Sequence, residues 1–150
     1  MDLHHIIYVS KAVHITTADL DDIVNAAHNF NTKNNITGML LYIDGKFFQV
    51  IEGNKEDINN LYAKIRTDPR HKNITTVSAH PIKFRTFKGW NMRYKAITEK
   101  EFSELSGINV FTSLFSLKPG PKENVAFNFA RKFSRKSFPS PTWWDDRMSA

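Results

Sequence analysis

Cysteine is absent from the sequence, which excludes disulfide bonds, thiolate metal sites and a cysteine nucleophile. The sequence also lacks an apolar run of about 18 residues, the length that a membrane-spanning helix requires. Its N-terminal stretch, MDLHHIIYVS, does not combine a basic segment with a long apolar one, as a signal peptide does. The six histidines show no metal-ligand spacing. From these absences we expect a cytoplasmic protein with neither membrane attachment nor a bound metal.

Acidic residues are the minority among the charged side chains, with 15 Asp and Glu against 21 Lys and Arg. The net charge is therefore +6 and the pI is near 9.6. This balance suits binding to nucleic acid, anionic lipid or a phosphate-bearing ligand, and an ordinary solvated surface explains it equally well. With 150 residues, 41% of them hydrophobic, the chain is long enough for one domain with a real core.

Residue patterns along the chain predict strands and helices in a definite order. The expected elements are a strand over 3–10, a helix over 17–32, a hairpin over 36–53, a helix ending before Pro69, a strand over 73–84 and a short strand over 89–96. Thr16 with Asp19 is suited to cap the first helix, and Asn54 the second. Asp44 and Gly45 tolerate the positive φ angles of a type I′ turn. The order β-α-β-β-α-β-β predicts an α+β, ferredoxin-like sandwich with both helices on one face of the sheet.

The C-terminal part of the chain reads differently. Its expected segments are one or two short helices over 98–117, a break at 118–121, a basic amphipathic helix over 122–137 and an irregular tail. We therefore expect a domain over residues 1–96 and a C-terminal helical extension and tail over 97–150. Phe48 and Val50 give the third strand a second apolar face, so the C-terminal helices or a partner subunit should cover it as a cap.

One residue of the predicted hairpin is unusual in so apolar a strand. Gln49 shares a strand face with Phe47 and Ile51, because side chains alternate between the two faces. An amide left unpaired in that position costs about 1–3 kcal/mol. Gln49 is therefore either satisfied by backbone or water, as buried amides commonly are, or it serves a functional partner.

Other polar or polarisable side chains are expected near Gln49. Tyr8 lies in the middle of the first strand, and Asn31 lies on the apolar stripe of the first helix. Trp90 and Met92, with Tyr94, alternate on one face of the predicted fifth strand. Taken alone, each is also an ordinary core residue or, for Asn31, a helix-end residue. Together they predict a phenol, two amides, an indole and a thioether that face the gap between the sheet and the helices.

These residues, in this order, resemble the BLUF family of blue-light sensors that use flavin. The matching motifs are Tyr8, Asn31 ahead of Ile36-Thr37-Gly38, Leu40-Leu41-Tyr42, Phe47-Phe48-Gln49-Val50-Ile51-Glu52-Gly53, Asp68-Pro69-Arg70-His71 and Trp90-Asn91-Met92. Each motif is weak by itself, and the ordered set, which covers about residues 3–96, is specific. The sequence departs from the family at Asn35, a loop position where the family often has glycine.

The resemblance implies a non-covalently bound, oxidised flavin, FAD with FMN as the alternative, held between the two helices. It implies that light rearranges a hydrogen-bonded chain of Tyr8, Gln49 and the flavin, and that strand five relays the change through Trp90 and Met92. The other implied contacts are Asn31 at the polar edge of the ring, Ile23 and Ile65 on its faces, and one or more of Arg66, Arg70 and His71 at the phosphate. Basic side chains suit that last task because they form charge-assisted bonds to phosphate.

The resemblance also implies a photoreceptor and not an enzyme, because the sequence leaves no room for a cyclase or phosphodiesterase domain. We expect the short type of the family, which signals to a downstream protein or through a homo-oligomer. The basic helix around Arg131 is either that contact or a cover for the sheet. The alternatives are a basic ferredoxin-like nucleic-acid-binding module without flavin, and a small hydrolase of the acylphosphatase type. The sequence lacks the glycine-and-aromatic strand of the former and the arginine loop of the latter.

Overall fold

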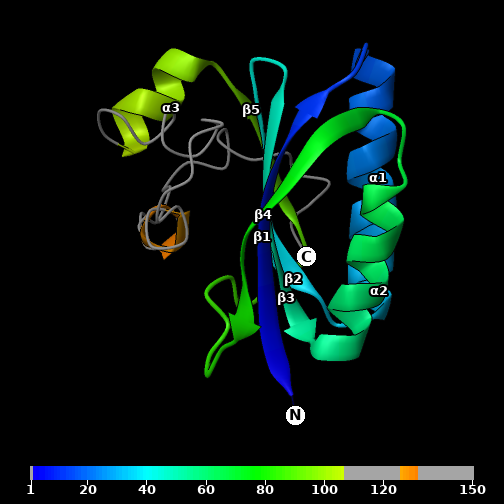
Figure 1. Ribbon diagram of the computed structural model, residues 1–150, viewed down its shortest axis with the longest axis vertical. Helices are drawn as coiled ribbons and strands as arrows, with labels where there is room; N and C mark the ends of the chain where they lie inside the picture. Colours follow the sequence, from blue (N-terminus) through cyan, green and yellow to red (C-terminus); the bar gives the residue numbers. More distant parts are fainter. Residues whose placement is uncertain (1, 107–125, 132–150) are drawn as a thin grey trace.

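The computed structural model describes residues 2–106 and 126–131, which form a mixed sheet covered by helices on both faces (Figure 1). The elements are β1 (Leu3–Ala12), α1 (Thr17–Lys33), β2 (Thr37–Ile43), β3 (Lys46–Asn54), α2 (Lys55–Arg66), β4 (His71–Pro81), β5 (Arg93–Ile97) and α3 (Glu99–Ser106). The strand order is β4-β1-β3-β2-β5, in which β2 and β5 run parallel and the other neighbours antiparallel. This arrangement confirms the predicted ferredoxin-like α+β sandwich, with α1 and α2 on one face.

The local signals in the sequence act as predicted at three element boundaries. Thr16 Oγ1 accepts from the Asp19 backbone N–H at 3.1 Å, and the Asp19 carboxylate accepts from the Thr16 N–H at 3.0 Å, which completes a capping box. Asn54 Oδ1 accepts from a backbone N–H in the first turn of α2 at 3.1 Å. Asp44 and Gly45 take φ angles of 44° and 84° in the hairpin turn. The turn at Asp44 and Gly45 brings β2 and β3 together in the register that the site requires.

Strand β3 is buried on both faces, and its side chains alternate between two hydrophobic clusters. Phe47 and Ile51 belong to the cluster beneath α1 and α2, whereas Phe48 and Val50 belong to the cluster on the opposite face. Gln49 is on the helix side with Phe47 and Ile51, as the alternation predicts. The amide is therefore placed under the two helices.

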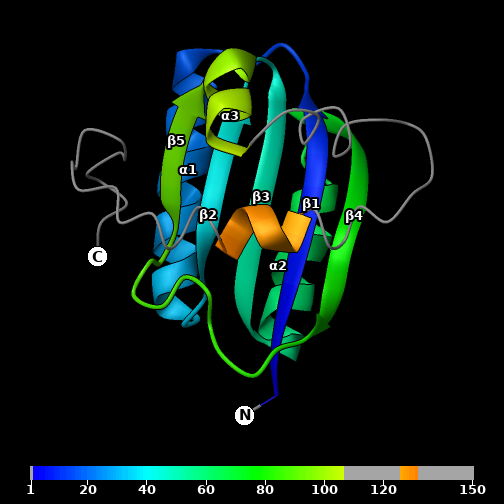
Figure 2. The same ribbon diagram turned by 90° about the vertical axis from the view of Figure 1, so that its left-hand side faces the viewer.

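The second face of the sheet is covered by α3 and by a helical segment over residues 126–131 (Figure 2). Phe129 of that segment meets Phe48 edge-on, with ring centroids 5.3 Å apart, and lies 4.7 Å from the ring of Phe102 in α3. The expectation that C-terminal helices cover this face is confirmed for the described residues. The remaining predicted C-terminal features, over 107–125 and 132–150, lie outside the described residues.

The prediction for the fifth strand was wrong in its first half. Strand β5 begins at Arg93, because the chain turns before it: Gly89 has a φ of 84°, and the Trp90 N–H donates to Phe87 O at 2.9 Å. Without a continuous strand the alternation rule does not apply to Trp90 and Met92. Met92 is buried in the cluster beneath α1 and α2, and Trp90 packs against the cluster on the other face. The two side chains lie on opposite sides of the sheet.

None of the helices within residues 2–106 and 126–131 is long and apolar enough to cross a membrane.

Strands β2 and β3 approach so closely at Gly38 that no side chain fits. A Cβ at this position would lie 1.9 Å from the backbone oxygen of Val50, next to Gln49. We expect Gly38→Ala to lower the free energy of unfolding by at least about 2 kcal/mol, because a strand must shift. Urea denaturation measures the loss. Gly45→Ala is the control: its Cβ meets nothing within 4 Å, so only backbone strain of about 1 kcal/mol is expected. Equal losses would contradict the steric explanation.

The pH dependence of stability should be set in part by His5, which is buried with its Nε2 2.7 Å from Ser78 Oγ. Burial, with smaller effects from His80 and His4, lowers the pKa of His5 from 6.5 to about 4. Between these values the unfolded chain binds the proton more readily, so stability falls as the pH drops from about 6.5 towards 4. We expect a loss of roughly 1–2 kcal/mol by pH 4.5, followed as a lower Tm. His5→Gln should show a shallower fall, and an unchanged slope would contradict this assignment.

Candidate functional site

A cavity lies between α1, α2 and the facing side of the sheet, with a volume of about 250 Å³. This volume is close to the lower end of small-molecule sites, about 300 Å³. Most of its wall is apolar, and a few polar groups converge on it. The predicted site residues that line it are Tyr8, Ile23, Asn31, Gln49, Ile65, Arg70 and His71.

Tyr8 and Gln49 form a buried pair on the floor of the cavity. They are directly opposite each other in the β1–β3 register, and each is 4% exposed. The Tyr8 hydroxyl donates to Gln49 Oε1, and Gln49 Nε2 donates to Met92 Sδ at 3.6 Å. Burial raises the pKa of Tyr8 well above its usual range, so the phenol stays neutral and remains a donor. Both ends of the amide are thus engaged by the protein, in one of the two orientations that an amide can take.

Asn31 presents an unpaired amide to the same cavity. Its side chain is fully buried, and neither Oδ1 nor Nδ2 has a hydrogen-bond partner among the described residues. The backbone of Asn31 is fixed, because its carbonyl accepts from the Ile36 N–H at 2.9 Å. An unpaired buried amide costs about 1–3 kcal/mol, so such a group indicates a ligand that offers one donor and one acceptor along an edge. The side walls beside it are apolar and come from Ile23 of α1 and Ile65 of α2.

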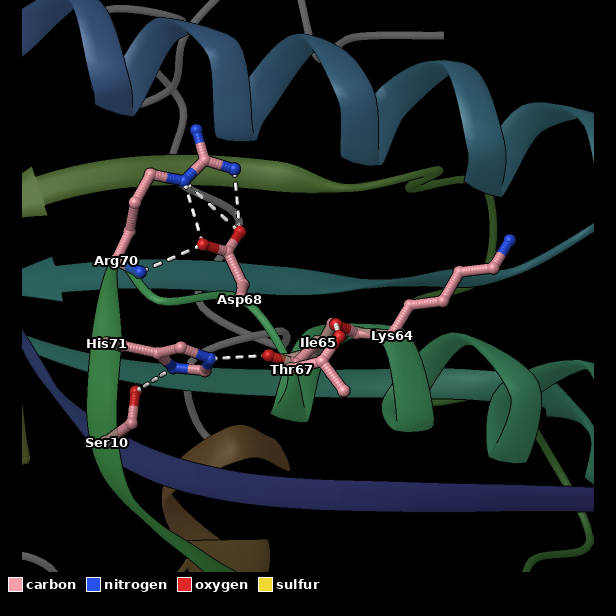
Figure 3. Close-up of polar contacts among 7 residues, drawn as sticks. All are labelled: Ser10, Lys64, Ile65, Thr67, Asp68, Arg70 and His71. Atoms are coloured by element: carbon pink, nitrogen blue, oxygen red, sulfur yellow. Dashed lines mark hydrogen bonds and ion pairs between the residues drawn. The ribbon is translucent and has the colours of Figure 1, made fainter.

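Two basic residues, Arg70 and His71, lie where α2 ends and β4 begins, and their side chains contact different partners (Figure 3). Arg70 binds Asp68 in a fork, with Nε 3.0 Å and Nη2 2.7 Å from the two carboxylate oxygens. The side-chain hydrogen bond from Arg70 holds the pKa of Asp68 below its usual range. His71 Nε2 donates to Ile65 O at 2.6 Å, and its Nδ1 lies 2.8 Å from Ser10 Oγ. Because a carbonyl only accepts, Nε2 carries a proton in this contact.

Two further basic residues lie on α2 with different orientations. Lys64 lines the cavity, with its Nζ 4.7 Å from the ring centroid of Phe30 on α1. Lys64 was not among the residues predicted from the sequence, although its place beside Ile65 on a helix that faces α1 was a usable signal. Arg66, which was predicted, is exposed and is not among the cavity-lining residues: its Nη1 donates to the Tyr62 hydroxyl at 3.3 Å.

Trp90 stands apart from the cavity. It is half-buried on the second face of the sheet, with its ring centroid 5.4 Å from that of Phe87 and 5.1 Å from the Arg93 guanidinium. Met92, two residues further on, is fully buried and touches the Gln49 amide. The structure therefore brings Met92 to the site and keeps Trp90 outside it.

Comparison with known proteins gives a consistent picture. A family model described as sensors of blue-light using FAD, BLUF, matches residues 3–93. The photoactivated adenylate cyclase subunit beta of Euglena gracilis is 41% identical over 81 residues, which make up 53% of this chain and 9% of the cyclase subunit. The chain thus spans only a small part of the length of this relative.

Solved structures of other proteins are similar to this chain in fold. The structure of BlsA in its photo-activated state has a TM-score of 0.74 at 29% identity, and the match covers 90% of this chain and 96% of that one. The structure of Klebsiella pneumoniae BlrP1 with FMN and cyclic diGMP has a TM-score of 0.59 at 35% identity, over 63% of this chain and 26% of that one. With a family match over most of the sheet and both helices that enclose the cavity, the chain belongs to the BLUF family of blue-light sensors using flavin.

Proposed function

We propose that this chain is a blue-light photoreceptor that holds an oxidised flavin in the cavity between α1 and α2. The observation that carries the proposal is the pair of unpaired polar atoms on Asn31, which is fully buried and lines that cavity. The edge of a flavin ring offers a donor beside an acceptor, which is what one amide can satisfy on both sides. The residues present therefore fit the cofactor.

The cavity residues are suited by their chemistry to bind different parts of the flavin. Asn31 binds the polar edge of the ring, and the side chains of Ile23 and Ile65 lie against its faces. Arg70 and Lys64 line the cavity near the end of α2, where their charges are suited to the phosphate. His71 also lines the cavity, but its ring nitrogens are engaged by Ile65 O and Ser10 Oγ, so it is better suited to hold this end of α2 in place. FAD is the expected flavin from the family description, and FMN is the alternative because the BlrP1 structure contains it.

The light response is assigned to Tyr8 and Gln49. The flavin, when bound, supplies absorption of blue light and an excited state that accepts an electron. Tyr8 is the tyrosine that lines the cavity, and its hydroxyl donates a hydrogen bond to the Gln49 carbonyl. If the Tyr8 hydroxyl ceased to donate to that carbonyl, the amide could turn and exchange its two ends. A turned amide releases Met92 Sδ, which its Nε2 holds in the observed state.

The signal is proposed to leave the site through the segment that precedes β5. Met92 lies on the flavin side of the sheet and Trp90 on the other, so a shift of Met92 alters the packing of Trp90 on the second face. A downstream protein or a second copy of this chain would read that change. The chain is proposed to sense and not to catalyse, since the polar groups at the cavity serve ligand binding and one hydrogen-bonded pair.

Purification of the protein without added cofactor tests the proposal. We expect about one flavin per chain after gel filtration, released by denaturation and identified as FAD or FMN by mass. Trp90 fluorescence in a protein with Trp143 and Trp144 changed to Phe should then differ between dark and lit samples. Protein that elutes without flavin and takes up none on incubation would refute the assignment, and an unchanged Trp90 signal would refute the relay.

The nucleic-acid-binding alternative gains no support from the site. Such modules stack bases on an open sheet face. Here α1 and α2 cover one face, and α3 with residues 126–131 covers the other.

A further inference from the structure

Glu52 is a buried carboxylate on β3 for which the proposed photochemistry gives no task. Its side chain is fully buried. Oε1 accepts from the Phe87 N–H at 2.9 Å and from Thr37 Oγ1 at 3.0 Å, and Oε2 accepts from the Thr86 N–H at 2.6 Å. Burial raises the pKa of Glu52, and the two backbone hydrogen bonds oppose that rise. A carboxylate so deeply placed is stable only with such donors, so Glu52 and the backbone of the β4–β5 connection hold each other.

Arg85 reinforces the same connection from its other side. Its Nη1 donates to Thr37 Oγ1 at 2.9 Å and to Glu52 O at 3.0 Å, and its Nη2 donates to Asn35 O at 2.8 Å. One guanidinium therefore ties the start of this connection to the adjoining ends of β2 and β3. We call Glu52, Thr37, Arg85 and the amides of residues 86–87 the Glu52 clamp.

The clamp holds one end of a short segment whose other end touches the photoactive amide. Within the segment Phe87 O accepts from the Trp90 N–H at 2.9 Å, and Trp90 O accepts from the Gly38 N–H at 2.9 Å. The segment then crosses to the other side of the sheet, where Met92 Sδ accepts from Gln49 Nε2 at 3.6 Å. Only a few residues separate Phe87, which the clamp holds, from Met92, which contacts the Gln49 amide.

We propose that Glu52 is a positioning residue for the photoresponse, because its carboxylate fixes the backbone of residues 86–87. This anchor sets where Trp90 and Met92 lie relative to Gln49. The inference rests on the proposed photosensing function. With the anchor in place, Met92 returns to one position after each photocycle. Gln49 Nε2 can then donate again to Met92 Sδ. Without the anchor the segment samples more positions, and the dark arrangement re-forms at a different rate.

Glu52→Gln tests this directly, because it keeps the shape of the side chain and replaces one acceptor oxygen by an NH₂ group that cannot accept from a backbone N–H. The dark recovery rate after blue light should change about threefold or more, with flavin content unchanged. Ser78→Ala is the matched control. It removes a buried hydrogen bond of 2.7 Å to His5, on the β1–β4 side of the sheet. It should lower Tm and leave the recovery rate as in the wild type.

Thr37→Val is the second variant, because it removes one donor to Glu52 and keeps the strand propensity; it replaces Glu52→Gln if that variant does not fold. Amide hydrogen exchange at Thr86 and Phe87 should accelerate in either variant, a readout that needs no flavin. A recovery rate equal to that of the wild type, or a change matched by Ser78→Ala, would overturn the positioning role. If the wild type shows no photocycle, the proposed function itself fails, and exchange at the two amides still reports whether the clamp exists.

Discussion

Replacement of Gln49 by leucine is expected to abolish the light-induced red shift of the flavin absorption while leaving the flavin bound. Leucine fills a similar volume but offers neither an acceptor for the Tyr8 hydroxyl nor a donor for Met92 Sδ. Asn31, which is proposed to bind the ring edge, is untouched, so the cofactor should remain. The shift in the light-minus-dark absorption spectrum should fall by at least about tenfold, because the amide that is proposed to switch between Tyr8 and Met92 is gone.

A pair of tyrosine variants separates this mechanism from a general loss of packing. Tyr8→Phe should lose the shift as Gln49→Leu does. Tyr62→Phe is the matched control: Tyr62 is also buried, its ring centroid is 5.3 Å from that of Tyr8, and its hydroxyl lies 2.6 Å from Thr76 Oγ1. It should keep the shift. A normal photocycle in Gln49→Leu, or equal effects of the two tyrosine changes, would be incompatible with the proposed Tyr8–Gln49 switch.

Replacement of Asn31 by leucine should change flavin affinity and protein stability in opposite directions. The side chain is fully buried and unpaired, so an apolar residue of similar size should raise the unfolding free energy of the flavin-free protein by about 1–3 kcal/mol. The same change removes the proposed partner of the ring edge, so the Kd for flavin should rise about tenfold or more. Fluorescence titration gives the affinity, and urea denaturation without flavin gives the stability.

Asn34→Ala is the control for an amide lost from the same helix end. Asn34 Nδ2 donates to Phe30 O at 2.8 Å, and the residue does not line the cavity. Its loss should lower stability and leave the affinity for flavin unchanged. If Asn31→Leu destabilised the flavin-free protein and bound flavin as tightly as the wild type, Asn31 would be a structural amide and not the ring ligand.

The residues of the site that the sequence placed well are those governed by short-range rules. Tyr8 and Gln49 fall on the helix-facing side of adjacent strands because alternation holds along β1 and β3, and the turn at Asp44 and Gly45 fixes the β2–β3 register. Asn31 follows from helical spacing on α1. For these residues a local period, read within one element, is enough to give the face on which a side chain lies.

The errors and omissions arise where the chain leaves regular structure. Trp90 and Met92 were placed on one face by alternation, and the turn at Gly89 removes the strand that this rule requires. The Glu52 clamp was missed because its donors come from a connection far away in the sequence. Lys64 was missed because a lysine on a helix is by default a solvated residue. In each case the surroundings of the residue depend on the path of a loop or on what a helix packs against, and a local sequence pattern gives neither.

The central claim is that the cavity between α1 and α2 holds a flavin whose state is read by Gln49. The most direct test is the absorption spectrum of the purified protein in the dark, after blue light, and again after a period in darkness. Flavin bands that move to longer wavelength on illumination and return in darkness are the predicted result. A colourless protein that takes up no added flavin, or flavin bands that do not respond to light, would contradict the account.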